Sequence, residues 1–329
     1  MDSVTQIVLG ATIAAVCVPK QHRRKAVLIG AMLGTAPDLD VFIDYGDAVA
    51  NFTYHRGFTH SLFALMPFSI FLWAILKRFY EPVRTAPGPW FLAISLALIT
   101  HPLLDAHTAY GTQLFWPLAS PPVMWSTIFI IDPLYTLPLL IGVIVILIKP
   151  QNTAAFRTLA TGLVLSSIYL VWSWTAKLHV ENRVLASLKN DTHSVNIFST
   201  PAPFNTLLWR VVVVQDDNYL EGYYSMLNAE QTISFQTHKK NKELIEQVKD
   251  LSSVQRLEWF AQGFNKTTII DDRLVISDLR MGFEGNYVFN HAVAKIGNPH
   301  WHEIKSELLP SQLGIEDLTI VWNKLIGKS

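Results

Sequence analysis

Four long apolar blocks in the first half of the chain predict its architecture. They run from Ser61 to Leu76, Trp90 to Leu104, Thr127 to Ile148 and Leu159 to Ala176. A helix that crosses a bilayer needs about 20 predominantly apolar residues, so these blocks predict about four long spans. Two shorter runs, Val4 to Val18 and Ala26 to Ala36, flank the basic stretch KQHRRK. They predict a helical hairpin whose arms are short for full spans.

The hydrophobic pattern changes after Lys177, where no apolar run is long enough to span a membrane. The β-branched and aromatic runs TLLWRVVVV, YLEGYYSML and RLVISDLRMGF predict strands. The stretches KNKELIEQVKDL and SVQRLEWFAQGF and the tail from Pro310 to Ile326 predict helices. The sequence therefore predicts an α-helical membrane bundle at residues 1–178, followed by a soluble α+β domain at residues 179–329.

The composition agrees with a membrane protein and narrows the chemistry. The 329 residues are 50% hydrophobic and 16% charged, whereas a soluble protein carries about 25% charged residues. A net charge of zero argues against an electrostatic nucleic-acid binder. Cys17 is the single cysteine, which excludes an internal disulfide and a cysteine-based metal cluster. A metal ion would have to be held by His, Asp or Glu.

The distribution of basic residues predicts the orientation. The loops Pro37 to His60 and His107 to Ser126 contain Arg56 as their only Lys or Arg. The alternate loops contain Lys20, Arg23, Arg24, Lys25, Lys77, Arg78, Arg84, Lys149 and Arg157. Basic loops stay in the cytoplasm. We therefore expect a multi-pass protein of the bacterial inner membrane whose C-terminal domain faces the periplasm or cell exterior.

Two pairs of polar residues lie at predicted helix ends. In APDLDVFID, Asp38 and Asp40 follow the second short run, where a helix-terminating turn is the simpler interpretation. In THPLLDAHTAYGTQ, His101 and Asp105 are four residues apart and so share one helix face. Ionisable residues in membrane spans are costly and usually functional. The alternative is a hydrogen-bonded His–Asp pair that only joins two helices.

The stretch NFTYHRGFTHSL places His55, Arg56 and His60 just before the Ser61 block. His60 should lie near the start of that helix, with His55 approaching from the loop, while Thr59 or Ser61 caps the helix. Arg56 has two interpretations. It either clamps a phosphate or another anion, or pairs with Asp44 or Asp47.

Six of these residues map to the same extracytoplasmic end of their helices. Imidazoles and carboxylates are the ligands of zinc and of hydrolytic two-metal sites. We therefore expect the six side chains to converge on one metal centre: Asp38, Asp40, His55, His60, His101 and Asp105.

The same motifs carry a family resemblance. The stretches MDSVTQIVLGA, PDLDVF, YHRGFTHSL, THPLLDAHTAYGTQLFWP and IFIIDPLYTLPLL resemble a bacterial family of inner-membrane proteins described as membrane-bound, metal-dependent hydrolases. The stretches TPAPFNTLLWRVV and YLEGYYSML look like the extra C-terminal domain of one branch. The resemblance implies a metal-dependent hydrolase whose motif residues are Asp38, Asp40, His55, Arg56, His60, His101 and Asp105.

The predicted reaction is hydrolysis assisted by a divalent metal, with zinc favoured and manganese or magnesium as alternatives. The metal would lower the pKa of a bound water, Asp38 or Asp132 would accept its proton, and Arg56 would neutralise an anionic substrate. A site at the membrane surface suits an amphiphile such as a phospholipid or a lipid-linked phosphate.

Two other functional classes remain open at this stage. In a non-catalytic membrane scaffold, the polar cluster would only lock the bundle while the C-terminal domain binds a protein partner. A transporter would place its polar residues near the bilayer midplane, on interrupted helices. Asp132, Pro133 and Pro138 inside an apolar block keep that alternative open.

Overall fold

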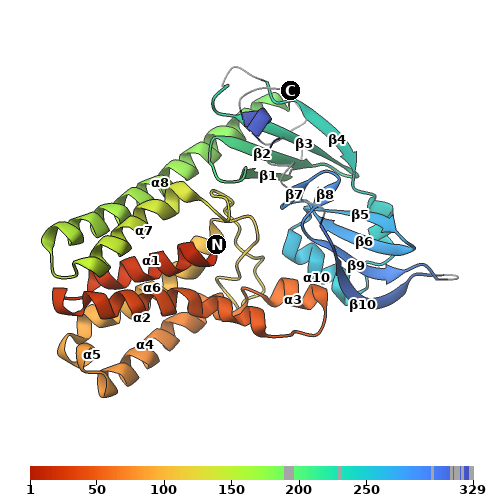
Figure 1. The fold of residues 1–329 in the computed structure, drawn as a ribbon. Helices are drawn as coiled ribbons and strands as arrows, with labels where there is room; N and C mark the ends of the chain where they lie inside the picture. The colour runs from red at the N-terminus through yellow and green to blue at the C-terminus, as the bar shows by residue number, and fades with distance from the viewer. Residues whose placement is uncertain are drawn as a thin grey trace. The chain divides into compact units, whose positions relative to one another are not determined.

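The computed structural model describes residues 1–188, 196–228, 232–297, 300–311, 314, 319 and 322–325. The chain folds as two compact units. The first contains Met1–Phe42 and Arg56–Trp174, and the second contains Ile43–His55 and Thr175–Ser329. A short segment from the first half of the sequence thus belongs to the second unit (Figure 1).

The first unit is helical. Its α-helices are α1 (Ser3–Cys17), α2 (Arg23–Thr35), α4 (Leu62–Phe79), α5 (Glu81–Thr85), α6 (Pro87–Ala106), α7 (Pro133–Ile148) and the first part of α8 (Thr153–Ser187). Short 3-10 turns, η1 (Lys20–His22), η2 (Ala36–Phe42) and η3 (Phe58–His60), lie between them. In the described part of the chain, α4, α6 and α8 are long and apolar enough to cross a membrane, and α1 and α7 are shorter apolar helices.

The two short apolar runs form α1 and α2, which pack against each other as the expected hairpin. Glycines set how closely the helices approach. A Cβ on Gly10 would lie 2.2 Å from the carbonyl oxygen of Gly30, and a Cβ on Gly30 would lie 2.2 Å from that of Gly10. Small residues at such crossings allow two membrane helices to pack backbone to backbone.

The apolar block from Thr127 to Ile148 forms a helix only from Pro133 onward. Asp132 caps this helix, because its side chain accepts a hydrogen bond from the amide of Leu134 at 3.1 Å, and Pro133 occupies the first helical position. Residues 107–132 contain no helix. The described residues contain three helices of spanning length, so the predicted number of about four spans is not confirmed.

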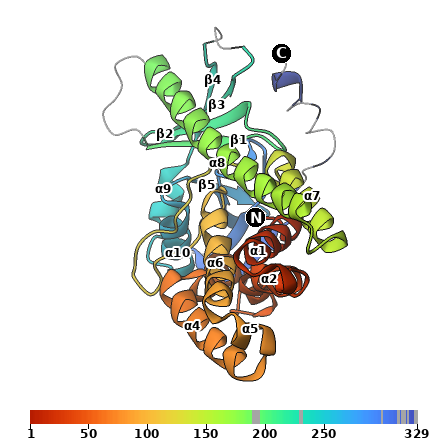
Figure 2. The same ribbon diagram turned by 90° about the vertical axis from the view of Figure 1, so that its left-hand side faces the viewer.

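Helix α6 is the centre of the first unit. It packs on α1, α2 and α4, and Figure 2 shows it between the α1–α2 hairpin and α4. Its side chains Trp90, Ile94 and Leu98 are fully buried, whereas Leu92 is half exposed. Because His101 lies one helical turn beyond Leu98, its side chain also points into the bundle.

The second unit contains two four-stranded antiparallel sheets. The first has the order β1 (Asn196–Pro201), β2 (Leu208–Val214), β3 (Asn218–Ser225) and β4 (Phe235–Lys239). The second has the order β10 (His302–Leu309), β9 (Asn290–Lys295), β6 (Arg273–Asp278) and β5 (Asn265–Ile270). The unit also contains a short pair, β7 (Gly282–Phe283) and β8 (Asn286–Tyr287), the helices α3 (Ala48–Tyr54), α9 (Lys242–Glu246) and α10 (Ser252–Ala261), and the C-terminal part of α8.

The three strand-like runs of the sequence form β2, β3 and β6, and the predicted helices form α9 and α10. Helix α9 covers only five residues of its predicted stretch. The tail predicted as a helix from Pro310 to Ile326 lies largely outside the described residues. In the core of this unit, Trp209 and Val211 of β2 pack on Val180 at the C-terminal end of α8.

Candidate metal centre

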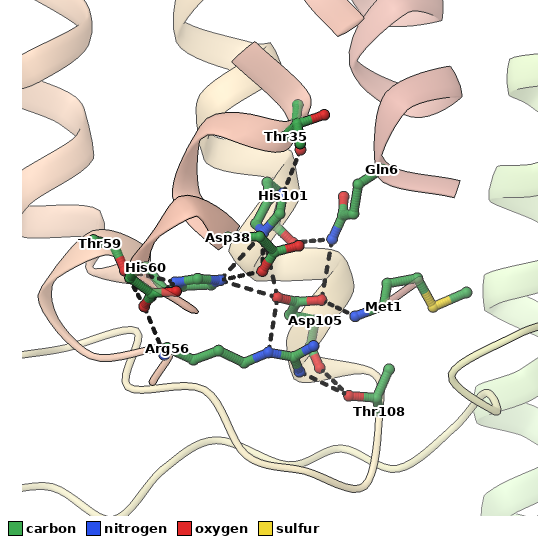
Figure 3. A network of polar contacts seen from close by, with 12 residues as sticks. Met1, Gln6, Thr35, Asp38, Arg56, Thr59, His60, His101, Asp105 and Thr108 are labelled. Carbon is green, nitrogen blue, oxygen red and sulfur yellow. Dashed lines mark hydrogen bonds and ion pairs between the residues drawn. The ribbon is translucent and has the colours of Figure 1, made fainter. Parts of the chain in front are cut away.

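Four polar side chains meet at one end of the helices of the first unit. Each offers one ligand atom, and these atoms lie within 4.8 Å of one another: Asp38, His60, His101 and Asp105. Asp38 comes from η2, His60 from η3, and the other two from the last turn and a half of α6. Figure 3 shows the four side chains pointing toward one another.

Five of the six separations between the ligand atoms are similar, and all six are within 4.8 Å. The Nε2 atom of His60 lies 3.3 Å from Oδ1 of Asp38 and 3.2 Å from Oδ2 of Asp105. The Nε2 atom of His101 lies 3.4 Å from each of the same two oxygens and 3.2 Å from Nε2 of His60. Four ligands held at about 2.0–2.1 Å around a tetrahedral zinc ion are separated by about 3.3–3.4 Å. Five of the six separations match this spacing, and two imidazoles with two carboxylates are a donor set that suits zinc.

Hydrogen bonds on the far side of each imidazole determine which nitrogen faces the cluster. Nδ1 of His101 donates to the carbonyl oxygen of Gly34 at 2.6 Å. Nδ1 of His60 lies 3.0 Å from the hydroxyl oxygen of Thr59. In neutral rings with these tautomers, both Nε2 atoms carry lone pairs directed into the cluster. Two lone pairs at 3.2 Å repel each other unless a proton or metal ion lies between them.

Asp40 supports the cluster from behind. Its Oδ2 accepts hydrogen bonds from the Thr59 hydroxyl at 2.7 Å and from the backbone amide of Arg56 at 3.1 Å. Because the Thr59 hydroxyl donates to Asp40, its oxygen accepts the Nδ1 proton of His60. This carboxylate–hydroxyl–imidazole chain orients His60, as the partners behind metal-bound histidines do. The structure thus places Asp40 behind a ligand and outside the four-residue group.

Asp105 is fully buried and uses its two oxygens differently. Oδ1 accepts a hydrogen bond from Nε2 of Gln6 at 3.0 Å and contacts the amino group of Met1. Within the described residues, Oδ2 accepts no hydrogen bond of good geometry, although Nε of Arg56 lies 3.2 Å away. A buried carboxylate oxygen without a hydrogen-bond donor is costly, and a metal ion would satisfy it.

Arg56 is held beside the cluster. Its Nη1 donates to the hydroxyl of Thr108 at 3.3 Å, and its guanidinium lies 5.0 Å from the ring centroid of Tyr110. Its backbone has a φ of 59°, which is uncommon for a residue other than glycine. Among the described residues, Arg56 forms an ion pair with Asp105 and not with Asp44 or Asp47.

Asp38 is the accessible member of the group. Its side chain is 20% exposed, whereas those of His60, His101 and Asp105 are fully buried. Burial alone would raise the pKa of the Asp38 carboxyl. When the Nε2 atoms of His101 and His60 carry protons, their hydrogen bonds to Asp38 outweigh this effect and hold that pKa well below its usual range. Asp38 is therefore the partly exposed and ionised member of the group.

Two other residues singled out in the sequence lie outside the four-residue group. His55 follows α3 and belongs to the second unit. Asp132 caps α7, with Oδ1 on backbone amides and Oδ2 accepting a hydrogen bond from the Tyr169 hydroxyl at 2.8 Å.

Sequence reasoning missed some of the supporting residues. Thr59 was considered only as a helix cap, but Ser61 caps α4 by accepting a hydrogen bond from the amide of Phe63 at 3.1 Å. Gln6 and the carbonyl group of Gly34 had no local signal. Both lie in helices that pack on α6, and that packing brings them to His101 and Asp105.

Comparison with known proteins places the helical part in a described family. Residues 1–180 match the sequence profile of the family described as YdjM inner membrane protein. The chain is also similar to the "Uncharacterized protein YfhP" of Bacillus subtilis (strain 168), with 28% identity over 229 residues, which is 68% of each chain. No solved structure matches the chain.

Proposed function

This chain belongs to the family of YdjM inner membrane proteins, and from that premise we propose that it is a membrane-bound, metal-dependent hydrolase. Asp38, His60, His101 and Asp105 hold the metal ion. The observation that carries the proposal is that five of the six ligand-atom separations lie between 3.2 and 3.4 Å, with all four atoms within 4.8 Å of one another. Zinc is favoured because two imidazoles and a tetrahedral spacing suit it better than magnesium, which prefers six oxygen ligands.

A bound metal of this kind acts as a Lewis acid and lowers the pKa of water toward neutrality. The residues of the chain supply the remaining functions. We assign the acceptor of a proton from water to Oδ2 of Asp38, because Oδ1 contacts the two histidines and the side chain is 20% exposed. We assign the proton acceptor to Asp38 in preference to Asp132, because both oxygens of Asp132 are occupied by the cap and by Tyr169.

Arg56 provides the positive charge for an anionic substrate. Its guanidinium lies against Oδ2 of Asp105 and is nearly fully buried, so water screens its charge only weakly. The fork of a guanidinium also binds the oxygens of a phosphate in pairs, which a lysine ammonium cannot do. A phosphoester is therefore the favoured substrate class.

Exposed apolar side chains near the cluster in sequence support an amphiphilic substrate. On η2, beside Asp38, the side chains of Leu39, Val41 and Phe42 are more than half exposed. Phe58 of η3, two residues before His60, is also half exposed. Exposed apolar side chains on η2 and η3, beside the cluster in sequence, are suited to contact with the membrane interface. The substrate we propose is a phospholipid or lipid-linked phosphate that enters from the bilayer, on the periplasmic or outer face.

The test is to measure metal content and activity of the protein purified in detergent. Wild type should retain zinc, and release phosphate or a headgroup from a panel of lipid phosphoesters. His60→Ala and His101→Ala should lose both. Arg56→Lys should retain the metal but turn over anionic substrates more slowly.

A scaffold would behave differently. If wild type binds no zinc, manganese or magnesium, and His60→Ala lowers only the melting temperature, the cluster is a structural hydrogen-bond network. Metal binding without hydrolysis of any ester in the panel would retain the metal centre and reject the hydrolase.

A further inference from the structure

The segment Ile43–His55 interrupts the first unit and belongs to the second. It leaves η2 three residues after Asp40 and ends immediately before Arg56. Two of the four proposed ligands, Asp38 and His60, therefore lie just outside its two ends. The other two ligands are on α6 and do not depend on this segment.

Aromatic packing holds the middle of the segment within the second unit. Phe52 of α3 is buried, and its ring centroid lies 4.8 Å from that of Phe260 on α10. It also lies 4.4 Å from the ring of Phe289 and 5.0 Å from that of His291. Burial of an aromatic side chain of this size is among the larger stabilising contributions in a core. The helix is thus anchored by a core residue.

Polar contacts secure both ends of α3. Nε of Arg256 on α10 donates to the hydroxyl of Thr53 at 2.9 Å, and its guanidinium lies 4.0 Å from the ring centroid of Tyr54. At the other end, the hydroxyl of Ser306 on β10 accepts from the amide of Val49 at 2.8 Å and donates to Asp47 at 2.8 Å. Residues of α10 and β10 therefore hold α3 in one position.

We propose that the second unit positions the metal centre by holding α3, with Phe52 and Arg256 as positioning residues. This inference rests on the proposed function. The chain from Tyr54 to His60 is short and includes the turn at Arg56, whose amide hydrogen-bonds Asp40 at 3.1 Å. Release of α3 would free both the Asp38 and the His60 side of the centre, while His101 and Asp105 stay in place on α6.

The experiment compares Arg256→Gln and Phe52→Ala with the wild type in detergent. The control is Phe198→Ala, which removes a buried ring of β1 that packs on Phe264 in the same unit. The first readout is hydrogen–deuterium exchange of the amides of residues 56–61. Arg56, His60 and Ser61 donate backbone hydrogen bonds there to Asp40, Gly57 and Phe58, respectively. The second readout is the dissociation constant for zinc.

We expect both α3 variants to exchange at least tenfold faster at residues 56–61 and to bind zinc at least tenfold more weakly. The control should leave both quantities near wild type. Unchanged exchange and affinity in Arg256→Gln and Phe52→Ala would overturn the inference. So would an equal effect of Phe198→Ala, because the cause would then be general loss of stability. If wild type binds no zinc, the proposed function fails, and the exchange rates alone decide whether α3 positions this segment.

Discussion

Replacing Asp40 by Asn distinguishes a metal ligand from a residue that orients one. In the structure, Asp40 bonds Thr59, which in turn bonds Nδ1 of His60. An amide of the same shape keeps the packing but removes the negative charge behind the hydroxyl. The imidazole of His60 becomes less basic and less firmly oriented. We therefore expect Asp40→Asn to bind zinc more weakly and still to bind it.

The expected loss of zinc affinity follows from what residues behind metal-bound histidines contribute in other proteins. Loss of a group behind a metal-bound histidine weakens metal affinity by about 10- to 100-fold, which is about 1.4–2.7 kcal/mol. With free zinc at 100 times the wild-type dissociation constant, zinc stabilises the wild-type fold by about 2.7 kcal/mol. The same zinc concentration should stabilise Asp40→Asn by about 0.4–1.4 kcal/mol. A variant without a ligand, such as Asp105→Ala, should gain almost nothing.

The assay is thermal unfolding in detergent across a series of buffered zinc concentrations, with direct zinc titration beside it. Asp44→Asn is the matched control, because Asp44 makes similar loop hydrogen bonds, to Gly46 and Asn51, in the exposed part of the segment. It should respond to zinc like wild type. If Asp40→Asn loses zinc as completely as Asp105→Ala, Asp40 is a ligand, and the assignment of a supporting role is wrong.

Three further predictions concern other parts of the molecule. Burial lowers the pKa of His291 to about 4, below the value of about 6.5 in an unfolded chain. Because the unfolded chain then binds the proton first, the second unit should lose up to about 3 kcal/mol of stability as the pH falls from 6.5 to 4. Denaturant unfolding should show this loss in wild type but not in His291→Phe. Gly30→Ala places a Cβ 2.2 Å from the carbonyl oxygen of Gly10 and should lower the free energy of unfolding by about 1–3 kcal/mol. The melting temperature should fall accordingly. An unchanged melting temperature would show that α1 and α2 move apart freely. Alkaline phosphatase fused after Ser329 should be active in a bacterial host and a green fluorescent protein there dark, and the reverse result would contradict the proposed orientation.

The periodicity of apolar residues was enough to predict much of the fold. Helices α1, α2, α4 and α6 and strands β2, β3 and β6 follow from local patterns, because a helix or strand must bury one face wherever it packs. In the block ending at Ile148, the helix starts at Pro133, later than the apolar pattern predicts. A cap at Asp132 and a proline after it begin the helix there, and these signals outweigh the continuing apolar run.

The candidate site also contains residues that local sequence patterns predict and residues that they do not. His101 and Asp105 were predictable as a pair, because four residues on a helix bring two side chains to one face. No such spacing rule applies to the segment that contains His55 and His60, because it includes a turn and is not one regular helix. A residue that follows a turn points where the backbone of that turn directs it, and the turn at Arg56 has a positive φ. Sequence spacing therefore could not show that His60 enters the cluster whereas His55 ends α3 in the second unit.

The composition of the chain and the spacing of its apolar and polar residues were enough to predict a membrane protein with histidines and carboxylates at its helix ends. Only long-range packing determined which of them meet. Gln6 and Gly34 reach His101 and Asp105 through helix contacts across many residues of sequence, and α3 joins the second unit through Phe52 and its aromatic neighbours. Such contacts depend on where whole helices and strands lie in space. The local pattern of a sequence does not show which distant elements will pack together.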